Sequence, residues 1–147
     1  MREILFRGKP VDNGEWVEGS LVQFSEGYCL IIVPESVDTT ALKAESISYL
    51  VDPKKIGQFT GLTDKNGKKI FEGDIIHYSC SDVTAIVCFG IYYDSDSKKK
   101  ATGFYVQWSE DGIVQQDPVS DIERDKQYGG EVIGNIYDNP ELLEVDT

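Results

Sequence analysis

Residues 60–76 read TGLTDKNGKKIFEGDII, and the centre of this stretch carries a hairpin-turn sequence. Asn66 and Gly67 accept a positive φ at low cost, as the tight turns of β-hairpins require. The apolar residues on either side predict a strand that enters the turn over 58–62 and a strand that leaves it over 69–71. We therefore expect this stretch to fold as a β-hairpin.

A sharp corner is expected directly after that hairpin, at Glu72-Gly73-Asp74. Gly73 can adopt a backbone angle that a residue with a Cβ resists. The Asp74 carboxylate is expected to accept hydrogen bonds from nearby backbone N–H groups. A structural role for Asp74 is favoured over a catalytic one, because a single carboxylate rarely acts alone in catalysis.

Alternation of apolar and polar residues continues after the corner and predicts three strands, each with one apolar face. These faces comprise Ile76, Tyr78 and Cys80; Val83, Ala85, Val87 and Phe89; and Phe104, Val106 and Trp108. Three adjacent apolar stripes are sufficient for a compact barrel or rolled sheet. Before the third stripe, the polar residues 94–100 are expected to form a solvated and mobile hairpin tip.

The N-terminal part shows the same pattern in shorter runs. Strands are expected over 4–7, 16–24, 28–33 and 47–51, with Gly8-Lys9-Pro10 ending the first and Ser25-Glu26-Gly27 turning between the second and third. Residues 35–45 have no clean period, and either a helical turn or a loop would fit them.

A boundary between two lobes is expected near Asp52-Pro53, because proline lacks the N–H donor of a strand ladder and constrains the residue before it. The expected division is an N-terminal β-rich lobe over 1–52, packed with a C-terminal lobe over 53–147.

The C-terminal segment is expected to be less regular than the strands before it. Residues 117–127 fit a loop with one helical turn, and residues 132–137 return to a strand. In Asn139-Pro140-Glu141, Asn suits a helix N-cap and Pro suits the first helical position. A short terminal helix that docks through Leu142 and Leu143 is therefore expected.

The composition indicates a globular protein. The chain has 147 residues, 40% of them hydrophobic, with eight Tyr, six Phe and two Trp, which is too rich in aromatics for disorder. Its apolar runs fall far short of the roughly 20 residues of a membrane helix, and the N-terminus lacks the apolar core of a signal peptide. The three cysteines, Cys29, Cys80 and Cys88, make an odd count that favours reduced thiols. Cytoplasmic residence is expected.

Charge is distributed unevenly along an acidic chain. The formal net charge is -12, with -5 over residues 1–52, +2 over 53–108 and -9 over 109–147. Such a surface repels phosphate backbones on average, so any nucleic-acid contact would be confined to the middle segment.

Three segments together resemble the YopX family of phage and prophage proteins. They are the opening MREILFRGK at 1–9, the hairpin stretch at 60–76 and the closing VIGNIYDNPELL at 132–143. The combination is more specific than any one segment, and the resemblance runs from the first residues to the last. It implies a mainly β fold with a small SH3-like barrel or roll after Gly73, and a phage or prophage origin. It implies no established activity, so no catalytic residue can be carried over.

Candidate chemistry centres on His77, Cys80 and Cys88, which could approach one another across a hairpin. His77 and Cys80 are an odd number of positions apart, so on a regular strand they face opposite sides. A structural zinc site usually draws four ligands with close paired spacing, and a lone His on a strand is more often a surface residue than a general base.

Other enzyme classes lack their usual residue patterns. With 26 acidic residues, chance carboxylate pairs do not indicate glycosidase chemistry, and the sequence contains no GxGxxG, Walker-type or HExxH motif. We therefore expect no catalytic residues, no metal and no cofactor.

The middle segment holds eight of the fourteen basic residues. If the two hairpin tips share a side, a positive binding surface would form from Lys65, Lys68, Lys69, Lys98, Lys99 and Lys100, joined by Lys54 and Lys55. Nearby aromatics, namely Phe71, Tyr92, Tyr93 and Tyr105, could stack on bases. Solvated lysines that keep the hairpin tips soluble are nevertheless the favoured interpretation.

The leading hypothesis is a non-enzymatic binding or assembly module that forms homo-oligomers through exposed strand edges. A phage or host protein is the further partner considered, and no membrane partner is expected. One alternative is a nucleic-acid-associated module that uses the lysine patch. Another is an acidic inhibitor that presents carboxylates to a host DNA-binding protein.

Overall fold

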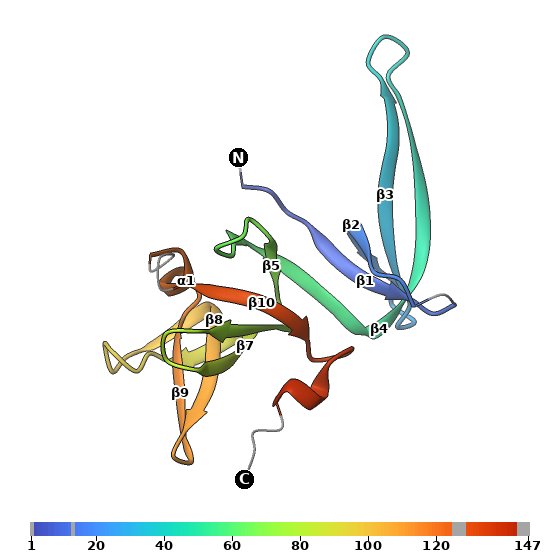
Figure 1. The fold of residues 1–147 in the computed structure, drawn as a ribbon. Helices are drawn as coiled ribbons and strands as arrows, with labels where there is room; N and C mark the ends of the chain where they lie inside the picture. Colours follow the sequence, from blue (N-terminus) through green and yellow to red (C-terminus); the bar gives the residue numbers. More distant parts are fainter. Residues whose placement is uncertain (1, 13, 125–128, 144–147) are drawn as a thin grey trace. The chain divides into compact units, whose positions relative to one another are not determined.

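Antiparallel strands make up most of the chain (Figure 1). The computed structural model describes residues 2–12, 14–124 and 129–143. The strands form two five-stranded sheets, with the orders β1-β2-β3-β4-β5 and β10-β6-β7-β8-β9. The mainly β fold predicted from alternation is therefore confirmed. The chain divides into two compact units, residues 1–59 and 60–147.

The strands of the first unit are β1 (Phe6–Pro10), β2 (Val17–Gln23), β3 (Cys29–Asp38) and the first part of β4 (Lys43–Thr63). Strand β1 pairs with both β2 and β4, while β3 joins β2 to β4, so the pairings close into a small barrel. Its interior holds Cys29, Ile31 and Val51, with Phe6, Val17, Leu21, Val33, Tyr49 and Ile56 packed around them.

Two glycines make this narrow barrel possible. A Cβ added at Gly8 would lie 3.0 Å from Ile31 Cγ1 and from the Val51 side chain, and a Cβ added at Gly19 would overlap the Ile32 carbonyl group. At Gly19 the backbone of β2 therefore approaches β3 more closely than any larger residue allows, and at Gly8 a larger residue would require the side chains of Ile31 and Val51 to shift.

Two expected strand ends are wrong. Gly8-Lys9-Pro10 continues β1, and Asp52-Pro53 lies inside the 21-residue strand β4. The register between β1 and β4 jumps from Gly8↔Ile56 to Pro10↔Val51, and Pro53 lies inside this irregularity. Proline is tolerated in a strand at a bulge because no ladder N–H is required there. The expected lobe boundary near Asp52-Pro53 falls within the same strand, whereas the two units divide after Phe59.

Residues 35–45 are neither a helical turn nor a simple loop. They form the outer part of a long hairpin in which β3 and β4 pair as far as Asp38↔Lys43, and this hairpin projects beyond β1 and β2 in Figure 1. At its end, Asp38 Oδ1 accepts hydrogen bonds from the N–H groups of Thr40 (3.0 Å) and Ala41 (3.1 Å). An aspartate of this kind is typical of turns.

The second unit begins with the end of β4 and contains all the remaining elements. The strands are β5 (Lys69–Phe71), β6 (Asp74–Tyr78), β7 (Val83–Tyr93), β8 (Lys100–Glu110), β9 (Ile113–Pro118) and β10 (Gly130–Asn135), and the helices are α1 (Ser120–Arg124) and the 3₁₀ turn η2 (Pro140–Leu143). The core contains the predicted Ile76, Ala85, Val87 and Val106, together with Ile70, Val119, Ile122 and Val132.

The hairpin and the corner of residues 60–76 are confirmed. Gly67 has φ 81° at the turn and Gly73 has φ 91° at the corner, whereas Asn66, for which a positive φ was also expected, does not have one. The Phe71 N–H donates a hydrogen bond of 2.7 Å to Asp74 Oδ2, as expected for a carboxylate that fixes the corner. The Gly73 N–H donates to the Val87 carbonyl group at 2.8 Å, which joins the corner to the core strand β7.

The second sheet is rolled. Gly90 pairs with Gly103 in the β7–β8 ladder, and both have φ near +150°, a conformation that favours glycine. Beyond this pair the chain reaches the outer edge of β9: the Ser95 N–H donates to the Gln116 carbonyl group at 2.9 Å, and the Gln116 N–H donates to Ser95 Oγ at 3.1 Å. Strand β9 is thus bonded to β8 on one side and to Ser95 on the other. The more detailed SH3-like description stays a prediction.

Two expectations about the strands of this unit need correction. Residues 117–127 were expected to be a loop with one helical turn. The first of them belong to strand β9, and helix α1 supplies the helical turn. Residues 125–127 lie outside the described part of the chain. Phe89 is 55% exposed, because the apolar face of β7 ends at the Gly90–Gly103 pair.

The expected terminal helix is a single 3₁₀ turn without buried residues, so Leu142 and Leu143 do not dock in a core. Pro140 is its first residue, as predicted. Asn139 Oδ1, however, accepts a hydrogen bond of 3.3 Å from the Asn135 N–H, which precedes this turn.

Candidate functional site

A pocket of about 520 Å³ opens in the second unit. The β6–β7 turn, strands β8 and β9, helix α1 and the 94–99 loop contribute to its walls. Its apolar wall consists of Tyr78, Val83, Val106 and Trp108. Tyr78 and Trp108 also pack against the core of this unit, so the pocket is the open end of that core.

The polar wall of this pocket is acidic. It carries four carboxyl groups, contributed by Asp96 in the β7–β8 loop, Glu110 at the end of β8, Asp117 in β9 and Asp121 in α1. Among the described residues that line the pocket, none is Lys, Arg or His. The pocket therefore combines aromatic surface with a concentration of negative charge.

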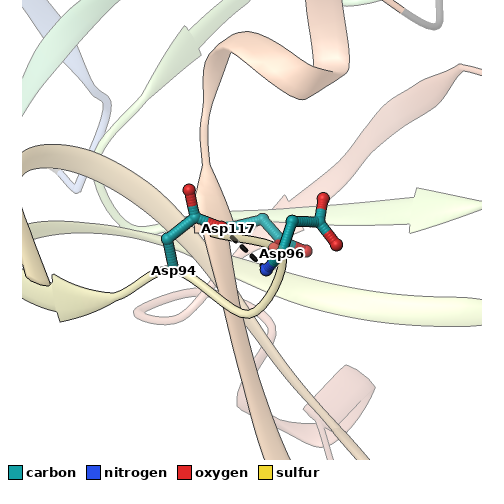
Figure 2. A group of neighbouring side chains, drawn as sticks. All are labelled: Asp94, Asp96 and Asp117. Carbon is teal, nitrogen blue, oxygen red and sulfur yellow. Dashed lines mark hydrogen bonds between the residues drawn. The ribbon is translucent and has the colours of Figure 1, made fainter. Parts of the chain in front are cut away.

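Hydrogen bonds within the β7–β8 loop place Asp94 and Asp96. Asp94 Oδ1 accepts from the Asp96 N–H at 2.9 Å, and the Asp94 N–H donates to the Lys99 carbonyl group at 2.9 Å. Figure 2 shows the side chains of Asp94 and Asp96 beside Asp117. One carboxylate oxygen from each of these three residues lies within 4.8 Å of the other two. A group of this kind would suit a cation such as Ca²⁺, which takes oxygen ligands.

The carboxylates of this region also affect the pKa of the neighbouring tyrosine, Tyr92. Burial raises the pKa of the Tyr92 hydroxyl above its ordinary value, and the nearby carboxylates of Asp94, Asp121 and Asp117 raise it further. Tyr92 stacks on Tyr105 with ring centroids 4.9 Å apart. Its hydroxyl therefore stays neutral at physiological pH, and it adds no charge beside the carboxylates.

His77, Cys80 and Cys88, the residues considered for zinc binding or catalysis, do not come together with the spacing of a metal site. His77 Nε2 lies 3.0 Å from Asp82 Oδ1. Cys80 is exposed and lines the pocket, whereas Cys88 is half-buried with its Sγ 3.8 Å from the Ile86 carbonyl oxygen. Among the described residues, the group formed by three Asp side chains is the one arrangement of three or more His, Cys, Asp or Glu with metal-site spacing.

The six lysines of the predicted binding surface lie on two hairpins of the second unit. Lys65, Lys68 and Lys69 belong to the β4–β5 hairpin, and Lys98, Lys99 and Lys100 to the end of the β7–β8 hairpin. Figure 1 shows the two turns at separate places. Lys65 Nζ forms an ion pair of 3.6 Å with Glu131 Oε2.

The aromatics expected beside these lysines are mostly unsuited to base stacking. Phe71 and Tyr92 are buried, and Tyr105 stacks on Tyr92, which leaves Tyr93 as the exposed ring of the four. Lys54 and Lys55 lie on β4 within the first unit.

The family resemblance of the sequence is supported by comparison with known proteins. A model of the YopX protein family matches residues 5–144. This chain belongs to the YopX family. The resemblance based on the opening, hairpin and closing segments is therefore confirmed. Among solved structures, this YopX-family chain is similar to the crystal structure of protein EF1440 from Enterococcus faecalis. The identity is 24% and the TM-score 0.48, and the match covers 98% of this chain and 100% of that one.

Curated proteins give no significant match to this YopX-family sequence. Within the described residues, no helix has the length and apolar character needed to cross a membrane.

Sequence reasoning missed the acidic pocket because its carboxylates come from four separate elements. One signal was nevertheless present. Asp111-Gly112 is a hairpin-turn sequence, and both residues have positive φ, 50° and 78°, between β8 and β9. This signal predicts a further strand after the one that contains Trp108. It would have placed Asp117 across from Val106.

Proposed function

We propose that this YopX-family protein is a non-enzymatic binding module whose second unit holds a positively charged organic group in the acidic pocket. The ammonium group of a lysine side chain and the guanidinium group of an arginine side chain have the required chemistry. The observation that carries the proposal is the combination of four carboxyl groups with Trp108 and Tyr78 around one opening.

Electrostatics favours a cation over other ligands. Carboxylates that share a small volume repel one another, and a cation between them removes this repulsion. The faces of Trp and Tyr rings attract cations as well. The pocket volume lies within the range of about 300–1,000 Å³ that is typical of small-ligand sites. A side chain or a small organic cation matches this size better than a bare metal ion.

The residues around the pocket do not suggest catalysis. Cys80 is the one strong nucleophile in the described lining, and the described lining contains no His that could act as its base. We therefore keep the non-enzymatic assignment as part of the proposal.

A basic protein is the proposed source of the cationic group. This extends the idea of an acidic inhibitor, because DNA-binding proteins present Arg and Lys side chains that pair with carboxylates. A phage or prophage origin and action in the host cytoplasm complete the proposal, with the family and the three reduced cysteines as support. Nucleic-acid binding through the lysines is less favoured, because the two lysine groups lie on separate turns and Lys65 is paired with Glu131.

The test is a titration of the whole protein with an arginine-rich peptide, a lysine-rich peptide, spermidine and CaCl₂, followed by Trp fluorescence and calorimetry. We expect the peptides to bind and the affinity to fall with added salt. The double variant Asp96→Asn/Glu110→Gln should weaken binding roughly tenfold or more, the effect of losing charge-assisted contacts.

Glu35→Gln/Glu45→Gln is the matched control, because it removes the same two charges from exposed carboxylates of the first unit. It should leave the affinity unchanged. Equal losses in the two double variants would show that net charge alone attracts the peptide. Binding of Ca²⁺ without the peptides would replace the proposal with a metal site, and no response to any cation would refute it.

A further inference from the structure

The first unit carries an exposed surface with no assigned role. From residue 34 to residue 48, every residue of the β3–β4 hairpin is exposed. In the part of the chain that the structure describes, residues 33–38 of β3 and 43–47 of β4 pair only with each other. The pairing of β2 with β3 ends at Ile32, and the pairing of β1 with β4 begins at Val51. This arm therefore has two unpaired edges and two uncovered faces.

An apolar stripe lies at the base of the arm, on the outside of the barrel. Cys29 and Ile31 of β3 and Val51 of β4 belong to the core. Side chains alternate between the two faces of a strand, so the neighbours of these residues along each strand face outward. The register places Val22 beside Leu30 and Leu30 beside Leu50, and the Phe24 N–H donates to the Tyr28 carbonyl group at 2.8 Å. The outward-facing stripe consists of Val22, Phe24, Tyr28, Leu30, Ile32 and Leu50.

Several side chains of this stripe are strongly exposed. Phe24 is 46% exposed, Tyr28 is 60% exposed and Leu50 is 44% exposed. Single exposed apolar residues are ordinary on protein surfaces, but a contiguous group indicates an interface. A two-stranded ribbon alone is also marginally stable in water. Both features indicate that another polypeptide covers the stripe and the arm.

Charge indicates which polypeptide this is. None of the six stripe residues is charged, although the protein has a formal net charge of -12 and the arm carries Glu35, Asp38, Lys43 and Glu45. A basic partner would find no carboxylate in the stripe to pair with. A second copy of the chain can approach through this stripe without placing carboxylates against carboxylates, and like charges elsewhere are kept apart by distance and screening. The same edge and the same stripe can also meet their own copies about a two-fold axis.

We infer that the protein self-associates through the outer stripe of the first unit and the β3–β4 arm. The stripes of two copies pack together, and the arm edges extend the contact by antiparallel strand pairing. This inference is independent of the pocket in the second unit.

The experiment measures the mass of the whole protein by sedimentation velocity and by light scattering over a range of concentrations. We expect a species with a multiple of the 16.4 kDa chain mass. Leu50→Glu should raise the dissociation constant roughly tenfold or more, since a buried charge at an apolar contact is strongly unfavourable. Higher salt should strengthen self-association, because it screens the repulsion between two acidic copies.

Ile91→Glu is the matched control, because Ile91 is 73% exposed on β7 of the second unit. It should associate as the unaltered protein does. Circular dichroism verifies folding, and Tyr28→Ser replaces Leu50→Glu if that variant unfolds. A monomer at every concentration would overturn the inference. So would an oligomer that survives both stripe substitutions or that Ile91→Glu dissociates.

Discussion

Asp64 Oδ2 accepts a hydrogen bond of 2.9 Å from the Val132 N–H, although the two residues are 68 positions apart in the chain. The other oxygen of the same carboxylate accepts from the N–H groups of Asn66 and Lys68, both at 2.9 Å. Asp64 is 2% exposed. A single buried carboxylate therefore fixes the hairpin turn and joins it to β10. This contact also links two of the three segments that carry the family resemblance.

Replacing Asp64 should destabilise the protein strongly. Asp64→Ala removes three charge-assisted hydrogen bonds and leaves the buried Val132 N–H without an acceptor. We therefore expect the free energy of unfolding to fall by about 3 kcal/mol or more. Urea denaturation measures this. Glu131→Ala is the control, since it removes only the partly exposed ion pair with Lys65, and such pairs contribute about 0–1 kcal/mol. Similar losses in the two variants would contradict this role of Asp64.

The same carboxylate should make stability depend on pH. Burial opposes ionisation of Asp64, but the N–H groups of Val132, Lys68 and Asn66 outweigh it, and its pKa lies below the ordinary value of 3.8. The stabilisation is fully present above the unfolded-state pKa and is lost as pH falls through that value toward the lower folded-state pKa. Urea denaturation from pH 7 to pH 3 should show a smaller loss for Asp64→Asn than for the unaltered protein. Equal losses would exclude Asp64 as a source of acid sensitivity.

The parts of the fold that were predicted correctly depend on local chemistry. Gly67 and Gly73 mark their turns in the sequence because positive φ is costly for other residues, and Asp74 bonds a residue three positions away. The role of Asp64 could not be predicted in this way. Its third donor comes from Val132, and only the assembled sheet brings the two together.

The failures also have physical reasons. Residues 35–45 lack alternation because neither face of the arm is buried, so no face needs apolar side chains. Pro53 was expected to end a strand. Strand β4 tolerates this proline because of a bulge in its pairing with β1, which is distant in the sequence. The acidic pocket could not be predicted for a similar reason. Asp96 belongs to a loop and Asp121 to a helix, and only the tertiary fold brings the two to one opening.

The narrow barrel of the first unit should be intolerant of side chains at Gly19. Gly19→Ala would place a methyl group against the Ile32 carbonyl group, so the strands must move apart. Overpacking of this kind costs about 1–3 kcal/mol. Thermal denaturation should show a lower midpoint for Gly19→Ala, while Ser20→Ala, an exposed neighbour on β2, should change little. An unchanged midpoint in Gly19→Ala would show that β2 and β3 separate more easily than their pairing indicates.

The three cysteines should differ in reactivity, which gives a direct check of their positions. Cys80 is exposed and Cys29 is buried. Burial raises the pKa of the half-buried Cys88 thiol and outweighs the opposite effect of its hydrogen bond to Tyr105, and Glu72 raises this pKa further. The thiolate is the reactive form, so Cys88 should react slowly even where reagent reaches it. Labelling with a disulfide reagent near pH 8 should give one fast phase from Cys80 and two slower ones. Cys80→Ser should abolish the fast phase, and a fast phase that persists in this variant would show that Cys88 or Cys29 is more accessible than the structure places it.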